Sequence, residues 1–478
     1  MTGLPDGAVV ELRRDVRVSD AGRTLIGGAP TRALYLTEAA VGLLVDRRLT
    51  VSSAASRRLA TLLLDAGIAE PVLDSLPKSA AGPGDVTVVI PVYGRTPGLE
   101  RLLASIPEGH PIVVVDDASP DPAPIAEAAE RYGAAVVVLP DNRGPGGARN
   151  AGLAEVRTEF VAFADSDVVI DDTVIPALLK HFVDPAVSVV APRVLGLVDG
   201  DETNWIGRYE AARSSLDLGA VGGSVRPRSP IAWAPAAFLL ARVADLGAAF
   251  TPGVRKGEDV DLVWRLVSEG RRIRYEPLVV VRHEHRTTVR TWLGRKLEYG
   301  SSATGLAKRH GSLVAPAILA PWSTVFILGL LLQRRWSIVL AGGSVVFAWL
   351  RIARRLGRGS HPYRDAARLT AKGVGSTVWQ TVALILRHWW PLAAVAAILS
   401  RRARRAVAAA VVLDAAVEYG RVRPRLDPIR FALARRLDDI AHGYGIWKSV
   451  VTERSARALL PHFVRSTRAT SAIRTQKS

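Results

Sequence analysis

The feature that most constrains the fold is a run of short Val/Ile/Ala-rich segments that alternates, from residue 85 onward, with amphipathic segments of helical period. The expected strands, which are apolar along their whole length, are 86–90, 112–115, 135–139, 160–164 and 188–191. We expect helices between them, for example over 98–106 and 125–132. Strands that are apolar on both faces are typical of a parallel sheet covered by helices on both sides. The sequence therefore predicts an α/β domain with a Rossmann-like, mostly parallel sheet.

Polar residues follow four of these strands at the point where each strand ends. They are Pro91-Val-Tyr-Gly94, Asp116-Asp-Ala-Ser119, the segment 141–150 and Asp165-Ser-Asp167. Open α/β sheets bind their ligands at the carboxyl ends of the strands, so we expect these four segments to lie together. The sequence predicts a ligand site at this edge of the sheet.

The glycine-rich third segment suits an anionic ligand. Gly144, Gly146 and Gly147 let the backbone approach a ligand closely and lead into a helix, whose N-terminus would favour an anion. Arg149 adds positive charge, and Tyr93 could stack on a base ring. The alternatives are an ordinary glycine-rich turn and an aromatic side chain in the core.

Two carboxylates at the fourth strand end are candidate metal ligands. Asp165 and Asp167 could hold Mg²⁺ or Mn²⁺, which prefer oxygen ligands and neutralise the charge of a diphosphate leaving group. Farther along, His283 and His285 follow another apolar segment, and a neutral imidazole could complete the site. Aspartates are also common in turns, and a lone histidine is often structural.

A candidate general base precedes another helical segment. Glu258 and Asp259 open an amphipathic stretch, with acidic side chains at the positive end of the expected helix. Transfer of a group to a hydroxyl needs one carboxylate to take the hydroxyl proton, and Asp259 is the candidate. Simple helix N-terminal charge is the alternative. Trp233 and Trp264 offer aromatic faces for an acceptor, although core packing suits at least one of them.

At these residues the sequence resembles the family 2 glycosyltransferases of the GT-A fold, over about residues 84 to 300. The resemblance implies inversion at the anomeric carbon with Asp259 as base, and a nucleotide-diphosphate sugar as donor. It implies Asp165, Asp167 and His283, in preference to His285, as the metal site, and Glu258 near the acceptor. The donor-binding residues that it implies are Pro91, Tyr93, Asp116, Asp117, Gly147, Arg149 and Asp165.

The layout of the chain resembles, more particularly, the glycosyltransferases of the mycofactocin system. We expect three parts: 1–78, a small winged-helix-like α+β unit; 84–303, the catalytic domain; and 304–478, a helical membrane-associated region. The first part resembles peptide-recognition domains, and a DNA-binding winged helix would show similar elements. The layout implies glucose from UDP-glucose and a small peptide-derived acceptor. Long-chain polymerisation is disfavoured, because the Gln-x-x-Arg-Trp motif of processive synthases is absent.

The last third of the chain carries the whole basic excess. From Gly305 onward there are 29 Lys and Arg against 7 Asp and Glu, whereas the preceding residues have 34 against 38. Basic clusters between apolar stretches favour an anionic membrane surface over nucleic acid. The segment 313–332 is uncharged and long enough to span a bilayer, and 336–350 is marginal. A buried helical domain is the alternative.

The chain has no cysteine, and its first residues lack the apolar run of a secretory signal. We therefore expect the catalytic domain on the cytoplasmic side of the cell membrane. Three other functions stay open: a family 2 enzyme acting on a lipid or envelope polysaccharide, a sugar-phosphate nucleotidyltransferase, and a non-catalytic protein that binds nucleotide sugars. The nucleotidyltransferase is disfavoured because no glycine-rich basic loop follows the first strand.

Overall fold

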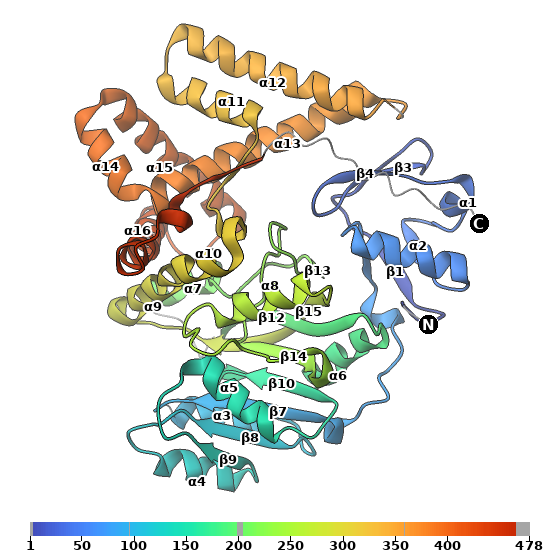
Figure 1. Cartoon of the computed structure of the whole chain (residues 1–478), viewed down its shortest axis with the longest axis vertical. Helices are drawn as coiled ribbons and strands as arrows, with labels where there is room; N and C mark the ends of the chain where they lie inside the picture. The colour runs from blue at the N-terminus through green and yellow to red at the C-terminus, as the bar shows by residue number, and fades with distance from the viewer. Residues whose placement is uncertain (1–2, 95, 198–203, 358, 465–478) are drawn as a thin grey trace.

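A nine-stranded sheet lies at the centre of the catalytic part in the computed structural model, which describes residues 3–94, 96–197, 204–357 and 359–464. The strand order is β11-β15-β12-β14-β10-β7-β8-β9, with β13 paired to β15 (Figure 1). The strands are β7 Val86–Val92, β8 Ile112–Asp116, β9 Ala135–Val138, β10 Phe160–Ala164, β11 Val168–Val169, β12 Val187–Leu197, β13 Gly223–Ser224, β14 Phe238–Arg242 and β15 Arg272–Glu284.

The sheet is mixed, whereas the sequence predicted a mostly parallel one. The strands β10, β7, β8 and β9 run parallel to one another, and β12 runs parallel to β15. The central strand β14 runs antiparallel to both β10 and β12. Because a strand buried on both faces is apolar in either direction, its sequence does not reveal its orientation. The predicted α/β class is confirmed.

Helices cover both faces of this sheet, each over its own apolar core. One face carries α3 Thr96–Ser105, α4 Ala123–Arg131 and α6 Val174–Leu179. The opposite face carries α5 Gly144–Glu155 and α8 Glu258–Ser268. The carboxyl ends of β7, β8 and β10 therefore meet at one edge, beneath the C-terminal helices (Figure 1).

The N-terminal part has a separate core and two small sheets, β5-β1-β6 and β2-β3-β4. Its elements are β1 Val9–Leu12, β2 Arg17–Ser19, β3 Thr24–Gly27, β4 Arg32–Tyr35, α1 Glu38–Gly42, β5 Arg48–Thr50, α2 Ala54–Asp65 and β6 Ala69–Pro71. Thr37 caps the first helix: its hydroxyl accepts from the Ala40 backbone N–H at 3.3 Å. The first helix has only 5 residues.

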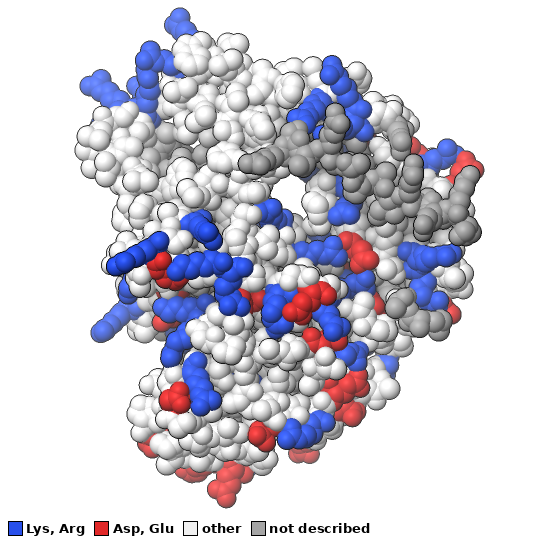
Figure 2. Space-filling model, in the orientation of Figure 1, with Lys and Arg blue, Asp and Glu red and all other residues white. Residues whose placement is uncertain are grey.

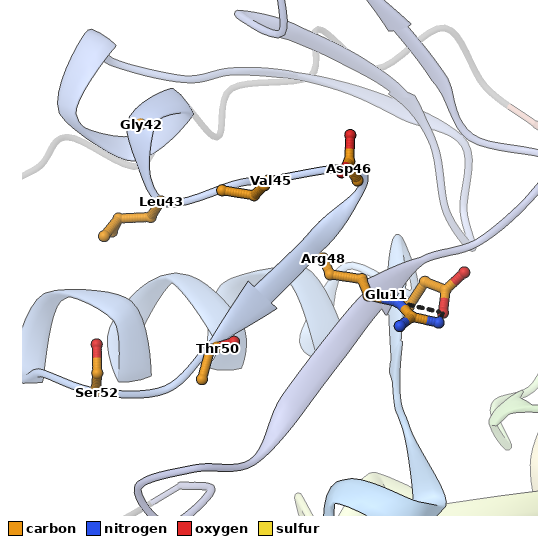
Figure 3. A pocket seen from close by; sticks show the side chains of 8 residues that line it. All are labelled: Glu11, Gly42, Leu43, Val45, Asp46, Arg48, Thr50 and Ser52. Atoms are coloured by element: carbon orange, nitrogen blue, oxygen red, sulfur yellow. Dashed lines mark hydrogen bonds and ion pairs between the residues drawn. The ribbon is translucent and has the colours of Figure 1, made fainter.

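A cavity of about 650 Å³ lies beside β5, the edge strand of the first sheet. Leu43 and Val45 line one side and Thr50 and Ser52 the other, with the Arg48 guanidinium bound to Glu11 at one end (Figure 3).

The C-terminal third is helical and packs above the sheet edge (Figure 1). Its helices are α9 Val289–Ser301, α10 Ala303–His310, α11 Pro321–Leu332, α12 Arg335–Arg355, α13 Pro362–Ala383, a π-helix η6 Leu384–His388, α14 Trp390–Leu399, α15 Arg401–Val422 and α16 Pro428–Thr452. Remaining short elements include α7 Trp205–Arg213 and the strand pair β16 Ile318–Leu319 with β17 His462–Phe463.

The predicted twenty-residue span over 313–332 is wrong. Its first half forms a 3-10 turn and the short strand β16, and helix α11 begins only at Pro321. Pro316 and Pro321 cannot donate the backbone hydrogen bonds that a helix continuing through them would need. Among the described residues, α12 is long and apolar enough to cross a membrane by length and composition, and α13–η6 with α14 forms a second candidate bent by 91°. Core helices of soluble proteins can have the same length and composition.

Candidate active site

A cavity of about 770 Å³ opens at the carboxyl edge of β7, β8 and β10. Its lining includes residues from all four polar strand-end segments, together with the start of α8. It also includes side chains from α9, η6 and α16, whose presence there was not predicted.

The carboxylate of Asp117, which lies in a separate loop, caps the N-terminus of helix α5. The carboxylate accepts from the backbone N–H of Arg143 at 2.6 Å and of Gly144 at 2.8 Å. Gly144 has φ of +76°, a conformation that favours glycine, and a methyl group at Gly147 would press on the Arg143 side chain. The helix N-terminus that we expected to hold a ligand anion thus already holds the carboxylate of Asp117.

Asp116 and Tyr93 lie near that loop, with Asp116 buried and Tyr93 exposed. One Asp116 oxygen accepts from the Ser119 backbone N–H at 2.9 Å, and the other is buried without a hydrogen-bond partner among the described residues. Tyr93, next to Pro91 in the cavity lining, is 53% exposed and so is not a core aromatic. A planar ring with an N–H donor would find both a stacking surface and an acceptor here.

Arg149 is 2% exposed and bridges two carboxylates. Its guanidinium lies 2.5 Å from Asp165 and 3.0 Å from Glu258. Although burial by itself opposes the charge, these two neighbours leave the pKa of Arg149 raised. Its charge therefore offsets two acidic groups of the site.

Asp167 and His283 come together because β11 pairs with β15, with Val168 opposite His283. Their Oδ1 and Nε2 atoms are 3.2 Å apart, and Arg286 contacts the other Asp167 oxygen at 3.2 Å. Among the described residues no three His, Asp or Glu side chains are grouped as a metal site. Asp165 turns toward Arg149 instead. A carboxylate oxygen beside an imidazole nitrogen nevertheless suits Mg²⁺ or Mn²⁺ as a pair of protein ligands.

His285, the other candidate, is mostly buried. Burial, followed by the neighbouring His283, lowers the pKa of His285 to about 4. It does not line the cavity, whereas His283 does.

Asp259 lies in the first turn of α8, which Gly257 begins with φ of +71°. The Val260 backbone N–H donates to its carboxylate at 2.8 Å. Burial, and then the charge of Glu258, raise the pKa of Asp259 to about 7. A carboxylate with a pKa near neutrality is suited to accept a proton from a hydroxyl and release it again.

The two candidate tryptophans lie in different environments. Trp233 lines the cavity. Trp264 is 7% exposed, donates its indole N–H to the Ala232 carbonyl at 2.6 Å and packs edge-on against His310 in the core. Of the two aromatic candidates, the structure therefore places Trp233 in the cavity and Trp264 in the core.

The sequence analysis missed several lining residues. Arg255 and Lys256 directly precede the Gly257-Glu258-Asp259 motif, so their proximity could have been inferred. No local signal marked Tyr299 on α9, Arg387 on η6, or Asp438 and His442 on α16.

Comparisons with known proteins identify a family. The family described as Glycosyl transferase family 2 matches residues 87–239. A pre-mycofactocin glycosyltransferase from Mycobacterium tuberculosis is 43% identical, over 96% of this chain and 98% of that protein. The succinoglycan biosynthesis protein ExoO of Rhizobium meliloti is 35% identical over 30% of this chain and 41% of its own. A solved mannosyltransferase from Pyrobaculum calidifontis, in complex with GDP-Man and Mn²⁺, aligns at 17% identity with a TM-score of 0.38, covering 64% of this chain and 89% of that one; a superposition this loose carries no argument.

Proposed function

The chain belongs to glycosyltransferase family 2 as a homologue of pre-mycofactocin glycosyltransferase, and we propose that it transfers glucose from UDP-glucose to pre-mycofactocin, inverting the anomeric carbon. The observation that carries the proposal is the position of Asp259. This half-buried carboxylate, with its pKa raised to about 7, opens into the cavity that Tyr93 and Asp117 also line.

The reaction is a direct displacement. Asp259 takes the proton of the acceptor hydroxyl, whose oxygen forms a bond to the anomeric carbon while the bond from that carbon to the nucleotide diphosphate breaks. Attack comes from the face opposite the leaving group, which inverts the centre. Asp167 and His283 would hold a divalent cation, which supplies charge to neutralise the departing diphosphate.

Donor binding uses groups on the strand-end loops. Tyr93 stacks on the base, and the unpartnered oxygen of Asp116 accepts from a base N–H. Near the diphosphate, Arg255 and Lys256 donate, among the described residues, to neutral oxygens of Asn142 and of Ser301, so their positive charge is available for a phosphate. The further donor residues are Pro91, Asp117, Gly147, Arg149 and Asp165.

The C-terminal helices dock on an anionic membrane surface. Large apolar side chains are exposed on α12 and α14: Trp336, Ile338, Val339, Phe347, Leu392, Val395, Ile398 and Leu399. Around these helices Figure 2 shows a mostly uncharged surface with Lys and Arg at its edges. Flotation with vesicles of phosphatidylglycerol, compared with phosphatidylcholine, tests this; equal recovery with both would contradict the electrostatic part.

The first 78 residues recognise a peptide segment. The edge strand β5 leaves one side of its backbone unpaired within its sheet, beside the cavity of Figure 3. Binding of a fluorescently labelled precursor peptide to the full chain, measured by anisotropy, tests this part separately from catalysis.

Release of free nucleotide diphosphate tests the central proposal. Detergent-solubilised protein is given UDP-glucose or GDP-mannose, with Mg²⁺ or Mn²⁺, with and without a pre-mycofactocin acceptor. We expect metal-dependent UDP release that rises with the acceptor. No release from either donor by folded protein would leave a binding-only function, and release that responds only to a lipid acceptor would replace the proposed one.

A further inference from the structure

The roof of the catalytic cavity is built by helices that lie outside the region matched by the family. Tyr299 from α9, Arg387 from η6 and His442 from α16 line the same cavity as Asp259. His442 and Asp259 are brought to one cavity although most of the C-terminal third separates them along the chain.

Close helix packing fixes the position of this roof. A methyl group at Gly300 of α9 would overlap the His442 carbonyl oxygen, and one at Gly445 of α16 would overlap the Leu297 carbonyl oxygen. Likewise, one at Gly443 would overlap the carbonyl oxygen of Arg387. The backbones of α9, η6 and α16 are therefore in direct contact, and His442 has little freedom relative to α9.

Buried ion pairs hold the same helices together. Lys296 of α9 is buried, with its Nζ 2.8 Å from Glu210 and 3.7 Å from Asp438. The Tyr209 hydroxyl donates to Asp438 at 3.0 Å, and Arg387 lies 3.4 Å from the same carboxylate. Breaking such a buried pair is costly, so the roof is a fixed part of the fold.

Charged groups on this side of the cavity have charged partners. Arg387 also contacts Asp439 at 2.7 Å, Arg213 lies 2.8 Å from Glu418, and Arg295 lies 3.2 Å from Glu298. A charged acceptor would have to compete with these pairs.

Three neutral groups on this side have no such partner. Within the described residues, no hydrogen bond reaches the indole N–H of Trp233, the hydroxyl of Tyr299 or the ring of His442, and none of these atoms is sealed off from the cavity. Burial, more than any neighbouring charge, raises the pKa of Tyr299 and lowers that of His442 well below its usual value. Both side chains therefore stay uncharged at neutral pH. Tyr299 lines the same cavity as the base Asp259.

We propose that Trp233, Tyr299 and His442 form the acceptor subsite, which binds an uncharged acceptor through its hydroxyl or amide groups and an apolar body. The C-terminal helices are then part of the active site as well as a candidate membrane anchor. Neutral hydrogen-bonding groups and an indole in one cavity suit such a molecule, because leaving the hydrogen-bonding groups unpaired in a closed complex would cost binding.

The test is a comparison of acceptor and donor kinetics in the full chain, and it rests on the proposed function. His442→Ala should raise the acceptor KM about 5- to 10-fold, and Tyr299→Phe about 3-fold, with the donor KM and the acceptor-independent release of UDP unchanged. His442→Gln, which retains a hydrogen-bonding group, should recover part of the loss. Tyr444→Ala on the same helix, whose side chain is 54% exposed, is the matched control.

The outcomes separate the two hypotheses. Transfer by the unmodified protein together with an unchanged acceptor KM in both His442→Ala and Tyr299→Phe would overturn the subsite and leave the function standing. The same would follow if donor and acceptor KM rose equally, since that would indicate a general structural role. Absence of transfer by the unmodified protein would remove the proposed function and the subsite with it. If His442→Ala does not fold, Tyr299→Phe and His442→Gln carry the same comparison.

Discussion

The two sides of the catalytic cavity are built in different ways. The donor side comes from loops that directly follow strands of one sheet, with Tyr93, Asp117 and Asp167 all inside a segment of fewer than 80 residues. Apart from Trp233, the proposed acceptor side comes from α9, η6 and α16, whose contributions meet through helix packing.

This difference indicates which groups of the cavity depend on helix packing and which do not. The strand-end loops are fixed by the sheet, whose strands are buried on both faces, so the donor groups keep their positions whatever covers them. The acceptor groups depend on the contact of α16 with α9. A change in that contact should alter acceptor use without altering donor binding, and the following predictions test this.

Asp259→Asn should have the largest effect. The amide cannot take the proton of the acceptor hydroxyl, so we expect kcat to fall by about 10²- to 10⁴-fold, with little change in donor binding. The measurement is acceptor-dependent UDP release, with UDP-glucose binding followed by calorimetry. Glu269→Gln, an acidic residue just beyond the far end of the same helix, is the control and should be near neutral. Substantial turnover in Asp259→Asn would remove Asp259 from this role.

His283→Ala should have the next largest effect, confined to the donor side. Loss of the imidazole beside Asp167 should raise the Mn²⁺ concentration needed for half-maximal activity by at least about tenfold, because one of two protein ligands is gone. A Mn²⁺ titration at saturating acceptor measures this. Unchanged Mn²⁺ activation would contradict the assignment of the metal to this pair. A selective rise in acceptor KM would contradict the separation of the cavity into a donor side and an acceptor side.

Much of the donor side was predictable because its signals are local. A polar pair after an apolar strand, such as Asp116 and Asp117, or the acids after Gly257 require only the rule that ligands bind at strand ends. The exact partners were not predictable. Nothing in the sequence indicates that Asp117 caps α5 from a separate loop, or that Arg149 is committed to Asp165 and Glu258.

The rest depends on contacts between distant segments. The orientation of β14 could not be predicted because a strand buried on both faces is apolar in either direction. The roof of the cavity could not be predicted because its helices lie far along the chain from the strand-end motifs. The error over 313–332 had a different cause. Pro316 and Pro321 are visible in the sequence and indicate a break in the helix, but the prediction followed only the length of the apolar segment. Composition sets what a segment can bury, and the prolines set whether it can be one helix.

Gly300→Ala should disturb the acceptor side through packing. The added methyl would overlap the His442 carbonyl oxygen, so α16 must shift, and we expect a loss of about 1–3 kcal/mol of stability. The acceptor KM should rise several-fold while the donor KM stays within about twofold. Thermal unfolding and steady-state kinetics measure the two effects.

The matched control for this change is Gly294→Ala on the same helix, where a methyl group meets nothing within 4 Å. That variant should be neutral or stabilised by up to about 1 kcal/mol, because alanine favours the helix. Equal behaviour of the two alanine variants would contradict the close contact of α9 with α16.

The smallest expected effect is a shift of the pH profile by Glu258→Gln. The active form of Asp259 is ionised, and its pKa is raised to about 7 by burial and by the charge of Glu258, so kcat/KM should fall as the pH drops through about 7. Removing the Glu258 charge stabilises the ionised form and moves this acidic limb to lower pH. At pH 7, where about half of Asp259 is already ionised, the gain cannot exceed about twofold.

The kcat/KM for the acceptor between pH 5 and 9 measures the shift. A limb that stays in place, or moves upward, would mean that a different group controls it. The control is Tyr299→Phe, which changes another residue of the same cavity without removing a negative charge and should leave the limb unmoved.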